Sequence, residues 1–197
     1  MRYWISALIW VVAAVAYAQA HLPVREMRVD WDRGSPKVSF SARDLADESV
    51  RQELSSGLRK RLQVTVSAHF KGSNRRMAVR QFTCDVTRDL WEDGYVVRIG
   101  TGSLSFKTLD QVLDHCLAVK GLFVGEPKSY ASREGREIYF YVRAEFNPIS
   151  KKQCQELIRP SPGDDPVGPI TVSIVRRRIC QAERTLEFRS DFSRVPE

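Results

Sequence analysis

Apolar and polar residues alternate with a period of two along most of this chain, which is the pattern of strands that cover a core with one face. The clearest run is 62–70, where apolar side chains alternate with Gln63, Thr65, Ser67 and His69. We therefore predict a strand there. The same alternation predicts further strands at 25–31, 38–42, 78–86, 95–99, 138–146, 170–174 and 186–192. Turn residues at 32–36, 72–74 and 92–94 predict antiparallel hairpins between neighbouring runs.

Three segments break this period and predict short helices. Asp47 is an N-cap candidate ahead of Val50 and Leu54, and Gly57 suits the C-terminal cap of a helix over 47–57. Two capping-box patterns follow. Thr108 with Gln111 places a helix at 108–120, and Ser150 with Gln153 places a third, shorter helix after residue 150. The third helix should stop before the proline at position 160.

This succession of strands predicts a mainly β fold, an antiparallel β-sandwich of immunoglobulin-like style with about seven strands and two or three short helices. The alternative is a two-layer α+β domain with both main helices packed on one sheet. Tyr139 and Tyr141 discriminate between them, because a helix that buried this pair would favour the α+β arrangement.

The first twenty residues have the pattern of a secretory signal peptide. Arg2 precedes an apolar run over 5–16, too short to span a membrane, and small residues follow it. Cleavage after Ala18 or Ala20 fits equally well. We expect an exported protein, periplasmic or extracellular, with membrane association only if the signal is retained. Residues 21–197 then form a single β-rich domain, with a mobile Pro- and Gly-rich loop at 160–169.

Oxidation of cysteines is permitted in such a compartment. The chain has four of them, none in a CxxC pair and none with zinc-site spacing; they are Cys84, Cys116, Cys154 and Cys180. Four cysteines can form two bridges in three ways. The shortest loops come from pairing Cys84 with Cys116 and Cys154 with Cys180. Each bridge would stabilise the fold by roughly 3 kcal/mol in the loop-entropy model. Buried free thiols are the alternative.

Basic residues exceed acidic ones, and the formal net charge is +7. Removing residues 1–20 leaves 30 basic against 24 acidic residues. This balance favours anionic partners, and in an envelope these would be an acidic protein or an anionic envelope component rather than nucleic acid. Candidate contacts are Arg176, Arg178, Arg184, Tyr139, Tyr141 and Arg143. For the arginine cluster the alternative is protection of an edge strand, and for the tyrosine face it is cover by a helix or a second sheet.

No pattern of residues predicts a catalytic, metal or cofactor site. The chain lacks GxSxG, HExxH and phosphate-loop motifs. His115 adjoins Cys116, but consecutive residues of a helix point roughly 100° apart, so they do not form a ready dyad. The leading hypothesis is a non-enzymatic binding or assembly module. An enzyme that acts on an envelope substrate is the alternative.

Three stretches also resemble an uncharacterised bacterial family of exported proteins, domain of unknown function 4390. They are 53–66, 106–113 and 139–148, the last ending in Asn147-Pro148. The resemblance implies a bacterial envelope protein and carries over no catalytic residue. The chain departs from the family pattern near its end, where tryptophans typical of the family are missing and an arginine-rich segment stands instead.

Overall fold

One large antiparallel sheet dominates the computed structural model, which describes residues 22–73, 75–150, 152–154 and 181–196. Its strand order is β10-β8-β3-β4-β5-β6. β9 also pairs with β8, on the same side of β8 as β10. The strands are β3 (Lys60–Phe70), β4 (Arg76–Asp89), β5 (Gly94–Ile99), β6 (Gly102–Phe106), β8 (Glu137–Phe146), β9 (Arg184–Arg189) and β10 (Ser193–Arg194).

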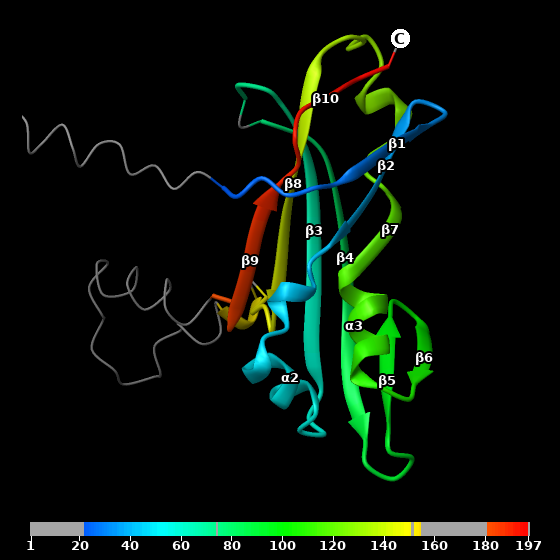
Figure 1. Ribbon diagram of the computed structural model, residues 1–197, viewed down its shortest axis with the longest axis vertical. Coiled ribbons are helices and arrows are strands. Elements are labelled where there is room, and N and C mark those ends of the chain that lie inside the picture. The colour runs from blue at the N-terminus through cyan, green and yellow to red at the C-terminus, as the bar shows by residue number, and fades with distance from the viewer. Residues whose placement is uncertain (1–21, 74, 151, 155–180, 197) are drawn as a thin grey trace, which may run out of the picture.

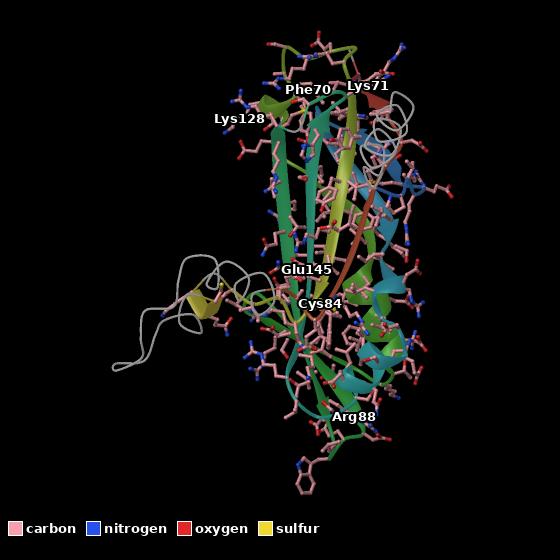
Figure 2. The ribbon with its side chains drawn as sticks, turned by 90° about the vertical axis from the view of Figure 1, so that its left-hand side faces the viewer. Phe70, Lys71, Cys84, Arg88, Lys128 and Glu145 are labelled. Atoms are coloured by element: carbon pink, nitrogen blue, oxygen red, sulfur yellow. A yellow bond between two sulfur atoms is a disulfide. The ribbon has the colours of Figure 1, made fainter. Side chains whose placement is uncertain are left out.

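A second layer covers one face of this sheet, which we call the inner face. It contains a three-stranded antiparallel sheet of order β1-β2-β7 and two α-helices on the same side of the long strands (Figures 1 and 2). The elements of this layer are β1 (Arg28–Asp32), β2 (Ser35–Ser41), η1 (Arg43–Leu45), α2 (Glu48–Leu54), α3 (Leu109–Leu117), β7 (Ala118–Phe123) and η2 (Pro127–Ser129).

The core lies between these two layers. On β8, burial alternates strictly, because every second residue from Ile138 to Phe146 is at most 1% exposed while the residues between them are half-buried. Leu62, Val64 and Val66 on β3 continue the same buried surface. The strands predicted at 62–70 and 138–146 are therefore confirmed, with the side chains on the faces that the alternation indicated.

The fold class is confirmed as mainly β, with antiparallel sheets in a sandwich-like arrangement and three short helices. Tyr139 and Tyr141 lie half-buried on the outer face of the large sheet, and no helix among the described residues covers them.

The helix starts were predicted more accurately than their ends. The Asp47 side chain caps α2 by accepting from the Val50 N–H, and Thr108 and Gln111 form the predicted capping box of α3. Ser150 and Gln153 form the other one. The expected helix at 108–120 was too long, because residues 118–123 pair with β2 as strand β7.

Three strands were not predicted, namely β6, β7 and the two-residue β10. Four of the five residues of β6 are exposed, and only two of its residues, Leu104 and Phe106, are large and apolar. The remainder of the third helix, the loop at 160–169 and the strand at 170–174 lie outside the described residues, as does the signal segment at 1–20.

Candidate functional site

The outer face of the large sheet carries rows of polar side chains that bond across strands. Gln81 Nε2 on β4 donates to Gln63 Oε1 on β3 at 3.0 Å, and Gln63 Nε2 donates to Glu145 Oε2 on β8 at 3.1 Å. One row further along, Arg143 on β8 pairs with Glu145 at 2.8 Å and with Glu187 on β9 at 3.6 Å. Such cross-strand pairs stabilise a sheet face that no second layer covers.

Aromatic rings gather beyond this polar region, toward the end of β3 that carries Phe70. The His69 ring stacks on Tyr139 at 5.2 Å between centroids and meets Tyr141 edge-on at 6.4 Å. Phe192, in the segment between β9 and β10, meets Tyr139 edge-on at 5.9 Å and is 42% exposed. The four rings come from three segments that are far apart in the sequence.

Cationic side chains border these rings. Lys71 Nζ lies 4.9 Å from the centroid of Phe192, and the Arg189 guanidinium lies 5.0 Å from the same ring on another side. We call the set of His69, Lys71, Tyr139, Tyr141, Arg189 and Phe192 the outer patch. Figure 2 shows Lys71 at the end of the long strands where the patch lies. Rings bordered by cations in this way suit a partner with both flat and anionic groups.

Two residues of the outer patch, Lys71 and Tyr141, contact acidic side chains, and these contacts shift pKa values. Lys71 pairs with Glu137 at 2.6 Å and holds the pKa of that carboxyl below its usual range. Burial, reinforced by the hydrogen bond to Glu187, raises the pKa of Tyr141 far above its usual value, so its hydroxyl stays protonated at physiological pH.

The structure separates the predicted contact residues into groups. Tyr139, Tyr141 and Arg143 are neighbours on the outer face, as the alternation required. Arg184 is not with them, because its guanidinium extends to Asp47 at the start of α2, 3.3 Å away. That residue therefore anchors a helix N-cap rather than a shared surface. Arg176 and Arg178 lie outside the described residues.

The expected cover of the tyrosine face by a helix or a second sheet is not found in the described parts of the chain. Sequence reasoning also missed Lys71, Arg189 and Phe192 as patch members. A lysine next to a turn and a phenylalanine after the last strand carry no signal of their own. The pairing of β8 with β9 and β10 brings Arg189 and Phe192 beside Tyr139, and the pairing of β3 with β8 brings Lys71 there.

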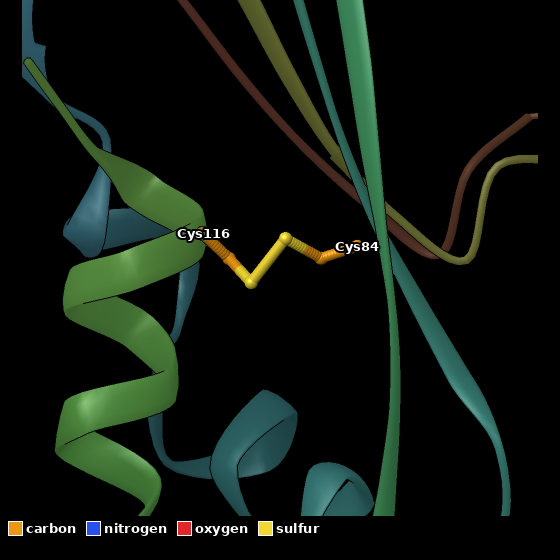
Figure 3. Close-up of a disulfide and its surroundings, with 2 residues drawn as sticks. All are labelled: Cys84 and Cys116. Atoms are coloured by element: carbon orange, nitrogen blue, oxygen red, sulfur yellow. A yellow bond between two sulfur atoms is a disulfide. The ribbon is translucent and has the colours of Figure 1, made fainter. Parts of the chain in front are cut away.

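Of the pairings that the sequence left open, Cys84 with Cys116 is present. The bond joins β4 to α3 between the two layers, with Cα atoms 6.1 Å apart and both residues fully buried (Figure 3). Cys154 is disulfide-bonded as well, and Cys180, with which it would close the other short loop, lies outside the described residues. Cys116 carries no free thiol, and a nucleophilic cysteine beside His115 is therefore not available in this state.

Ser67 and His69 form a contact that resembles a nucleophile and its base, with Ser67 Oγ 2.9 Å from His69 Nε2. Ser67 is 2% exposed, beneath the rings of the outer patch. Its strand β3 is paired on both sides, so its backbone N–H groups are engaged in the sheet and cannot form an oxyanion hole. The contact is better explained as hydrogen bonding that satisfies two buried polar groups.

Within the described ranges, no cluster of histidine, cysteine and carboxylate side chains has the arrangement of a metal site. Over the same ranges, none of the helices has the length and apolar character needed to cross a membrane. The structure therefore defines an antiparallel, sandwich-like β protein with an aromatic and basic patch on the sheet face that no described element covers. Comparison with protein-family models, with curated proteins and with solved structures found no match to the chain.

Proposed function

We propose that this chain is a non-enzymatic binding or assembly module of a bacterial envelope, which contacts an anionic partner through the outer patch. The observation that carries the proposal is the patch itself. Four aromatic rings lie with Lys71 and Arg189 on a sheet face that no described element covers. The partner is an acidic protein or an anionic component of the envelope.

Three further features support this proposal. The buried Cys84–Cys116 bond suits an oxidising compartment, as export would provide. The first twenty residues have the pattern of a signal peptide. The resemblance to domain of unknown function 4390 also implies an envelope protein. Export and family membership remain part of the proposal.

The test compares two double variants of the exported protein, each of which removes two positive charges. Lys71→Gln with Arg189→Gln alters the outer patch, whereas Arg28→Gln with Lys128→Gln alters two exposed basic residues of the second layer, on β1 and η2. Capture from envelope extracts, and binding to vesicles with anionic or neutral headgroups and to an anionic polysaccharide, would be measured for both. We expect the patch variant to lose about tenfold in affinity for its partner, and the control to lose little.

Equal losses in the two variants would indicate attraction by overall charge and would contradict a specific patch. Turnover of an envelope substrate by the purified protein, without capture of any partner, would instead support the alternative of an enzyme. N-terminal sequencing of the exported protein tests the compartment directly, because an intact Met1 would contradict the export on which the choice of partner rests.

A further inference from the structure

Strand β4 has an open edge over much of its length. It pairs with β3 over residues 76–86, but β5 accompanies it only over 85–89. Figure 1 shows β5 and β6 beside the lower part of β4 alone. Residues 76–84 therefore have a strand neighbour on one side only, among the residues that the structure describes. An edge of this kind presents backbone groups that can pair with another chain.

The hydrogen-bond pattern identifies which backbone groups face this edge. The Asn147 N–H donates to the Arg61 carbonyl at 2.7 Å, so the backbone of Arg61 faces β8. Because directions alternate along a strand, Leu62, which is opposite Cys84, faces β4. The same alternation on β4 points the backbone groups of three residues toward the open edge, and none of them has a backbone partner in the described chain; they are Val79, Gln81 and Thr83.

A groove of about 910 Å³ adjoins the same edge on the inner side of the sheet. Its apolar lining comes from four elements, with Phe82 on β4, Ile99 on β5, Phe106 on β6 and Leu122 on β7. A strand added to β4 would continue the line of β5, and every second side chain would point toward this apolar lining.

The charges around the groove are mainly basic. Lys107 and Lys120 line it and Arg80 lies on the adjacent edge, and none of the three has an acidic partner within ion-pair distance in the described parts of the chain. The one acid in the lining, Asp114, is already paired with Arg43 at 2.8 Å. A second copy of this chain would bring the same cations to the edge and be repelled, whereas an acidic segment would be attracted.

We propose that the edge of β4 at 79–83 accepts an extended acidic segment of a partner protein as an added strand. Main-chain hydrogen bonds to Val79, Gln81 and Thr83 would hold its backbone. Every second side chain of the segment would point into the groove, with apolar ones against Phe82 and acidic ones beside Lys107 and Lys120. This site is separate from the outer patch and does not depend on the proposed function.

The probe is a labelled peptide of about seven residues, an ordinary strand length, in which glutamate, valine, valine and glutamate alternate with serine, so that the acidic and apolar side chains share one face. The same peptide with lysine in place of glutamate is its charge control. Binding is measured by fluorescence anisotropy, and amide hydrogen exchange is followed at Val79, Gln81 and Thr83. We expect the acidic peptide alone to bind and to slow exchange at these three amides.

Gln81→Pro removes one donor at the open edge without removing a bond to β3, since proline is tolerated where the N–H faces away from the sheet. Gln81→Ala keeps the donor and serves as its matched control. We expect Gln81→Pro to weaken peptide binding about tenfold. The double variant Lys107→Gln with Lys120→Gln should weaken peptide binding several-fold without altering the fold, because both positions are exposed. It therefore tests the proposal even if the proline variant does not fold.

Absence of acidic-peptide binding up to about 1 mM would overturn the proposal. Equal binding by Gln81→Pro and Gln81→Ala, with both folded, would do the same, and Arg76 and Arg80 would then simply keep the edge solvated. The patch variant Lys71→Gln with Arg189→Gln should bind the peptide normally. Failure of this proposal is thereby distinguished from failure of the outer patch.

Discussion

On the inner face of β8 the five residues from Ile138 to Phe146 that point into the core are at most 1% exposed, and all of them are apolar. On the outer face of the same strand the residues between them are half-buried and are tyrosine, arginine and glutamate. One backbone thus supports a surface that excludes water and a surface that satisfies its polar groups by cross-strand pairing. The difference indicates that apolar burial on the inner face supplies most of the stability. The outer side chains contribute less to stability and can contact a partner.

The strongest test of this comparison uses two neighbours on β8. Phe140→Ala opens a cavity between the layers and should lower the free energy of unfolding by about 3–5 kcal/mol. Tyr139→Ala removes a ring that stacks on His69 at the surface and should cost about 1 kcal/mol. Urea unfolding at neutral pH measures both. Similar losses for the two variants would show that the outer face is as much a core as the inner one.

Removal of the disulfide tests whether the two layers stay packed without a covalent bond between them. Cys84→Ala with Cys116→Ala opens a link across a sequence separation of 32 residues, and the loop-entropy model gives a loss of about 3–4 kcal/mol. Equilibrium unfolding of the double variant is compared with that of the oxidised protein. A midpoint unchanged in the variant would mean that packing of α3 on β4 alone holds the layers together.

The smallest effect is expected from an ion pair on the outer face. Arg61 Nε bonds Asp85 Oδ1 at 2.7 Å, and Arg59 contacts the same carboxylate; the hydrogen bond from Arg61, aided by Arg59, lowers the pKa of Asp85. The group is charged more readily in the folded state, so its stabilisation is present above about pH 4 and is lost as the pH falls through the folded pKa.

Asp85→Asn should therefore lower the free energy of unfolding at neutral pH by no more than about 1 kcal/mol, because both arginines are more than one-third exposed. The gap between variant and original should close below about pH 4. Urea unfolding at several pH values measures this. A gap that persists in strong acid would assign the effect to packing rather than to charge.

Much of the fold could be predicted because the period of two is a local property. Alternation at 62–70 and 138–146 reports which face is buried wherever one face of a strand meets a core. The capping residues Asp47 and Thr108 act on backbone groups within three positions, so the helix starts were also correct. The end of α3 was wrong because residues 118–123 become a strand only through pairing with β2, which is far away in the sequence.

The candidate site was only partly predictable for the same reason. Tyr139, Tyr141 and Arg143 share a face by alternation alone. Arg189 and Phe192 join them through the pairing of β8 with β9 and β10, and Lys71 joins them through the pairing of β3 with β8. Arg184 lies on the other face because it is opposite Phe146, whose side chain is buried on the inner face. The open edge of β4 had no sequence signal, since it depends on β5 being shorter than its neighbour.

By itself the sequence determined a β-rich chain with one apolar face per strand, the helix starts and a cysteine spacing compatible with a short bridge. These properties follow from side-chain geometry over a few residues. Only the tertiary structure decided which strands are neighbours, which face stays uncovered and where an edge stays open. Those features arise from contacts between distant segments, whose free energy depends on the packing of the whole sheet and is not encoded in any single stretch.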